Sequence, residues 1–126
     1  MPKMVTGEQL DELEKKMLAH LTPNVDKPGL HGTIARCMVA ALPKLARWSA
    51  DEYNRETPPS ETLEALATVA ANTLCSELDN LNVDIDVKVA AVNEFLHVLA
   101  EKTHRLMTNK TPGTFHQMPA QEVGHG

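Results

Sequence analysis

The clearest pattern in the chain is a regular series of apolar positions in its last third. The steps alternate between four and three residues, and the series comprises Ile85, Val89, Val92, Leu96, Leu99, Thr103 and Leu106. This spacing is typical of a helix that packs against other helices along its length. Further apolar residues beside the series widen the arc to roughly 200°, and they are Val87, Ala91, Phe95 and Val98. We therefore predict a helix from Asp84, its N-cap, to about Thr108 that is central in the fold or shared with another subunit.

A second helical stretch lies near the start of the chain. Thr6 and Gln9 have the spacing of a capping box, and Val5 and Leu10 occupy the two positions of a hydrophobic staple. The apolar repeat continues to Leu21, after which Pro23 ends it. The pattern predicts an N-terminal helix with a well-defined first turn.

Two more helices are expected between these. The first follows Asp26, a candidate N-cap, and its apolar stripe is Leu30, Ile34, Met38, Leu42 and Leu45. Pro43 predicts a kink or break there, and Ser49 with Glu52 forms a capping box that predicts a short extra helix. The other helix starts between positions 58 and 61, with the stripe Leu63, Leu66, Ala70, Leu74 and Leu78.

These elements define an all-α fold. We predict a small bundle of four main helices plus a short helix after Pro43, in one domain over 1–108, followed by an extended or flexible C-terminal arm over 109–126. The run from Leu81 to Val89 alternates like a strand, but its continuation into the long apolar series favours a helix from Asp84 onward.

Composition agrees with helical packing. Aromatic residues make up 3% of the chain and hydrophobic residues 42%, so the core must be aliphatic. The apolar runs are too short for a transmembrane helix, and the charged N-terminus argues against a secretory signal. Cys37 and Cys75 each lie in an apolar helical run and are predicted to be small buried hydrophobes. We expect a reducing, cytoplasmic compartment, or the host cytoplasm or virion for a viral protein.

Charge is unevenly distributed. Segment 27–47 carries Lys27, Arg36, Lys44 and Arg47 with no acid, whereas 48–86 carries nine acids against one arginine. We expect the two segments to attract each other within the monomer, and a dipolar surface that orients a partner is the alternative. With a break at Pro43, the basic segment would also fit a small helix-turn-helix DNA-binding regulator, although the net charge of −5 disfavours it.

Metal-ligand spacing occurs on the last predicted helix. It carries two Glu-x-x-His pairs, Glu94 with His97 and Glu101 with His104. Di-iron bundles place such pairs on two facing helices, whereas here both lie on one helix, roughly 120–200° from Val92. The pairs are thus expected to form a solvated stripe, with Glu101 and Arg105 paired at i, i+4, and a metal-binding bundle is a second alternative.

Two single residues have unusual positions. His31 falls on the apolar stripe of its helix, close in sequence to His20, with which it would form a pH-sensitive joint. Glu77 lies near the apolar stripe of the third helix and either extends to solvent or, if buried, pairs with Arg36 or Lys88.

The sequence carries no nucleophile motif or phosphate-binding glycine loop. We predict a non-enzymatic interaction protein without catalytic, cofactor-binding or metal-binding residues, acting through helical surfaces and the C-terminal arm. The expected partner is a protein or a second copy of the chain, and a homo-oligomer is favoured. Small acidic helical proteins of microbes and viruses often serve as adaptors, assembly components or inhibitors, and this class-level association guides the expectation.

Overall fold

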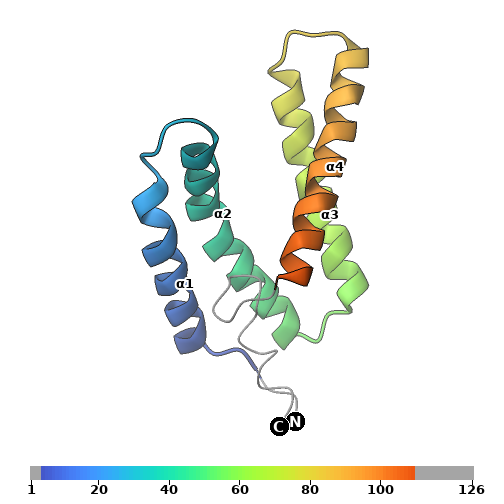
Figure 1. Cartoon of the computed structure of the whole chain (residues 1–126). Helices are drawn as coiled ribbons and strands as arrows, with labels where there is room; N and C mark the ends of the chain where they lie inside the picture. The colour runs from blue at the N-terminus through green and yellow to red at the C-terminus, as the bar shows by residue number, and fades with distance from the viewer. Residues whose placement is uncertain (1–3, 110–126) are drawn as a thin grey trace. The chain divides into compact units, whose positions relative to one another are not determined.

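The computed structural model describes residues 4–109, which form four α-helices and one short 3-10 helix without a β-strand (Figure 1). The all-α prediction is therefore confirmed. The chain divides at Pro58 and Pro59 into two compact units. Within the described residues, the first unit holds α1 and α2, and the second holds α3 and α4.

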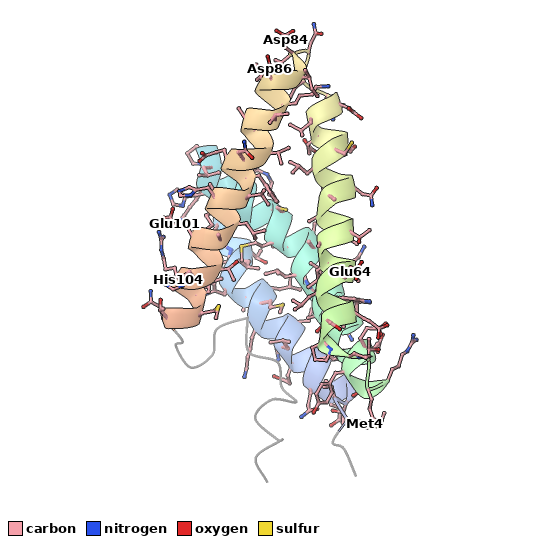
Figure 2. All side chains as sticks on the ribbon, turned by 90° about the vertical axis from the view of Figure 1, so that its right-hand side faces the viewer. Met4, Glu64, Asp84, Asp86, Glu101 and His104 are labelled. Carbon is pink, nitrogen blue, oxygen red and sulfur yellow. The ribbon has the colours of Figure 1, made fainter. Side chains whose placement is uncertain are left out.

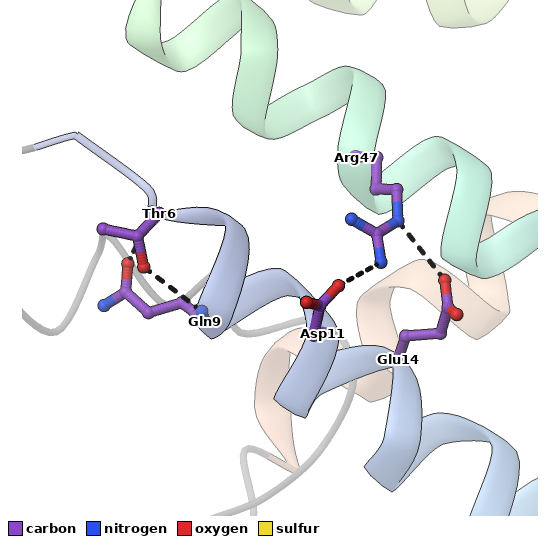
Figure 3. A network of polar contacts seen from close by, with 5 residues as sticks. All are labelled: Thr6, Gln9, Asp11, Glu14 and Arg47. Atoms are coloured by element: carbon purple, nitrogen blue, oxygen red, sulfur yellow. Dashed lines mark hydrogen bonds and ion pairs between the residues drawn. The ribbon is translucent and has the colours of Figure 1, made fainter.

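Helix α1, Gly7–Leu21, begins as its sequence predicts. The Thr6 hydroxyl accepts a hydrogen bond from the Gln9 amide at 3.2 Å, and the Gln9 side chain accepts one from the Thr6 amide at 2.9 Å (Figure 3). Val5 and Leu10 are both buried and share a core cluster with Ala50 of α2. The predicted staple thus also anchors α1 against the other helix of its unit.

Helix α2, Gly29–Asn54, is continuous, so the predicted break at Pro43 and the separate short helix after it are wrong. Proline removes one backbone donor and costs roughly 3 kcal/mol in a helix interior. Pro43 is itself buried in the first unit, and residues on both sides of it make tertiary contacts. Before it, Arg36 donates to the Val25 carbonyl at 2.7 Å, and after it Ala50 packs into the core cluster.

The start of α2 also differs from the expectation. Pro28 is the N-cap, and no side chain caps the helix, so Asp26 does not have the predicted role. A 3-10 helix over Thr22–Asn24 makes the turn instead, and the chain enters α2 through Gly29 with a φ of 71°. This left-handed conformation strains most residues but not glycine, so the entry to α2 depends on Gly29 rather than on a side-chain cap.

Arg47 connects the two helices of the first unit. Its Nη2 lies 2.8 Å from Asp11 Oδ1, and its Nε lies 3.3 Å from Glu14 Oε1 (Figure 3). The hydrogen bond with Asp11 is the main cause of a raised pKa of the Arg47 guanidinium. We expected the basic segment to attract the acidic segment after it, but the partners of Arg47 lie on α1.

Both cysteines are exposed and free, so the prediction that they are buried is wrong. Cys37 lies two residues from the buried Ala35, which turns it about 200° away around the helix axis. Cys75 lies on α3, where no residue is buried. An apolar run in the sequence therefore did not identify which side of each helix is covered.

The second unit consists of α3, Pro59–Asp79, and α4, Ile85–Thr108. Asp84 occupies the N-cap position of α4, as predicted, but its side chain makes no cap hydrogen bond. Its backbone carbonyl accepts from Val87 and Lys88 at 3.1 Å each. Neither helix buries a residue, so α4 is not a buried core helix within its own unit. Over residues 4–109, the structure has no helix with the length and apolar character needed to cross a membrane.

Candidate functional site

The α3–α4 hairpin is open. The two ribbons lie near each other beside the connecting loop (Figure 1). There, Lys88 Nζ lies 3.9 Å from Asp79 Oδ1. In the second view they diverge toward the far end of the hairpin (Figure 2). The part of each helix that follows the divergence has no covering neighbour within this unit, and most of its side chains are exposed.

On α4 the divergence exposes the apolar series identified in the sequence. Val92, near the loop, is half-buried on the side that also carries Lys88. Leu96, Leu99 and Leu106 lie within about 40° of Val92 around the helix axis. Leu96 is nevertheless 54% exposed and Leu99 50% exposed. Within the series, Val92 is therefore half-covered, whereas Ile85 and Val89 nearer the loop and the leucines beyond Val92 are exposed.

Helix α3 repeats this arrangement. Leu74 and Leu78, near the loop, are half-buried. Leu63, at the far end, lies within about 20° of Leu74 around the axis, and Leu66 flanks it. Leu63 is 67% exposed and Leu66 41% exposed. The two helices thus carry matching apolar stripes along the sides that face each other beside the loop.

We call the open part of these two stripes the inner face. It consists of five leucines, Leu63, Leu66, Leu96, Leu99 and Leu106. Clustered aliphatic side chains have no acid–base or nucleophilic chemistry, and their physical tendency is to leave water by contact with another apolar surface. The inner face is therefore a candidate contact surface. The sequence indicated its α4 half through the four–three spacing, but it did not show that the hairpin is open.

The two Glu-x-x-His pairs lie on the outer side of α4. In Figure 2, Glu101 and His104 are on the side of α4 away from α3. Glu101 accepts from Arg105 at 2.8 Å, as predicted, and His97 Nε2 lies 3.6 Å from its other carboxylate oxygen. The described residues contain no group of three histidine, cysteine or acidic side chains placed to hold a metal ion. The stripe is the solvated surface that its spacing predicts.

The remaining candidates lie on three different helices. His31 is exposed at the start of α2 rather than packed on an apolar face, and His20 is exposed near the end of α1. Glu77 is exposed on α3, so the buried polar network considered for it is absent there. Residues 110–126 of the predicted arm lie outside the described part of the chain.

The basic segment 27–47 lacks the geometry expected of a DNA-binding helix-turn-helix. Such a motif needs two helices joined by a turn, whereas α2 runs unbroken through Pro43. Two of the four cations are also engaged inside the unit. Arg36 bonds the Val25 carbonyl, and Arg47 bonds two carboxylates of α1. The contact surface of the second unit therefore remains the best-supported candidate site.

Searches with protein-family models, curated protein sequences and solved structures give no match to this chain.

Proposed function

We propose that the chain is a non-enzymatic protein that works by protein–protein contact, and that the inner face of the α3–α4 hairpin is its binding surface. The carrying observation is that this face exposes five leucines in helical register while its unit buries no residue. Adaptor, assembly component and inhibitor are the roles that such a surface serves, in a cytoplasmic setting.

The energetics support contact as the role of this face. Burying a leucine side chain fully is worth about 1.5–3 kcal/mol, so half-exposed leucines retain a large part of that free energy for a partner. Helices of this length obtain most of their stability from packing rather than from intrinsic propensity. A partner on the inner face would therefore supply binding energy and stabilise the hairpin at once.

Site-specific photo-crosslinking in cells that express the chain tests this proposal. A photoreactive residue replaces Leu99, on the inner face, or His97, on the outer stripe of the same helix. We expect an intermolecular adduct from position 99 and little or none from position 97. The mass of the adduct also shows whether the partner is this chain or another protein.

Three results would contradict the proposal. Adducts absent from both positions would remove the contact surface, and equal adducts from both would show that the inner face has no special role. A crosslink from position 99 to another part of the same molecule would show that the chain covers its own leucines.

A further inference from the structure

We draw no further inference here: the strongest candidate, the exposed apolar patch that the inner face forms on the α3–α4 hairpin, carries nothing beyond the proposed function, because nothing in the described part of the chain shows what covers it.

Discussion

The side chain of Asn54 holds the backbone of Val5 at both of its polar groups. Asn54 Oδ1 accepts from the Val5 amide at 2.8 Å, and Asn54 Nδ2 donates to the Val5 carbonyl at 3.0 Å. A single amide side chain thus connects the last turn of α2 to the residue that precedes the cap of α1. Because Val5 also packs against Leu10 and Ala50, this pair joins the polar and apolar contacts of the first unit.

Replacing Asn54 should therefore destabilise the first unit. Asn54→Ala removes both hydrogen bonds and leaves the amide and carbonyl of the buried Val5 without them, so we expect a loss of about 1–2 kcal/mol in the free energy of unfolding. Urea denaturation measures the loss, and faster hydrogen exchange at the Val5 amide locates it.

Asn72→Ala is the matched control for this change. Asn72 is exposed on α3, and its side chain donates only to the Thr68 carbonyl of the same helix. Alanine favours a helix more than asparagine, so this variant should be neutral or slightly stabilising. Equal losses from the two variants would show that the Val5 contact contributes nothing specific.

Gly32 marks a close approach within the first unit. It is buried in α2, and a Cβ placed there would overlap the Lys27 carbonyl oxygen and lie 2.9 Å from Arg36 Nη1. Gly32→Ala should thus cost about 2–3 kcal/mol, because backbone as well as side chain must move. Thermal and urea denaturation measure this loss.

Gly7 offers the same substitution without the overlap. A Cβ at Gly7 meets nothing within 4 Å, so Gly7→Ala should be neutral or stabilise α1 by a few tenths of a kcal/mol. If Gly32→Ala were as stable as Gly7→Ala, the turn between α1 and α2 would have to differ from the one described.

The ion pairs of Arg47 with Asp11 and Glu14 should contribute less to the free energy of unfolding than the Asn54 contact, and their contribution should depend on salt. Exposed ion pairs gain little from Coulomb attraction in water, and that gain is screened as ionic strength rises. Arg47→Ala should lower the urea midpoint slightly at low salt, and the difference from wild type should shrink in high salt. Arg47→Lys keeps the charge but lacks the planar guanidinium, so its urea midpoint should lie between those of wild type and Arg47→Ala. A salt-independent effect would indicate that packing of the arginine stem dominates.

Local signals in the sequence predicted local structure well. The capping box of Thr6 and Gln9 and the staple of Val5 and Leu10 depend on residues within five positions of each other, and the structure shows both. Asp84 lies at the predicted N-cap position, although its side chain makes no cap hydrogen bond. The end of α4 at Thr108 also agrees with the prediction. Hydrogen bonds and side-chain contacts within one turn follow directly from residue identity and spacing.

The sequence was less informative where the outcome depended on a distant neighbour. Pro43 has a fixed local cost, but whether the helix continues is decided by contacts that hold both of its halves, such as those of Arg36 and Ala50. Cys37 lies in an apolar run, but its exposure depends on which side of α2 packs in the first unit. The apolar spacing in the sequence indicated the α4 half of the inner face. Its exposure could not be predicted, because it depends on the divergence of α3 and α4.

The exposure of both cysteines leads to a last prediction. Cys37 lies on the uncovered side of α2, and Cys75 lies about 100° around α3 from the half-buried Leu74. Both thiols should therefore react with a thiol reagent in the native protein, with two equivalents consumed per chain at rates near those of the unfolded protein. Cys37→Ser and Cys75→Ser should each reduce the stoichiometry to one. A thiol that reacted only after unfolding would be covered by a surface that the described residues of the single chain do not supply.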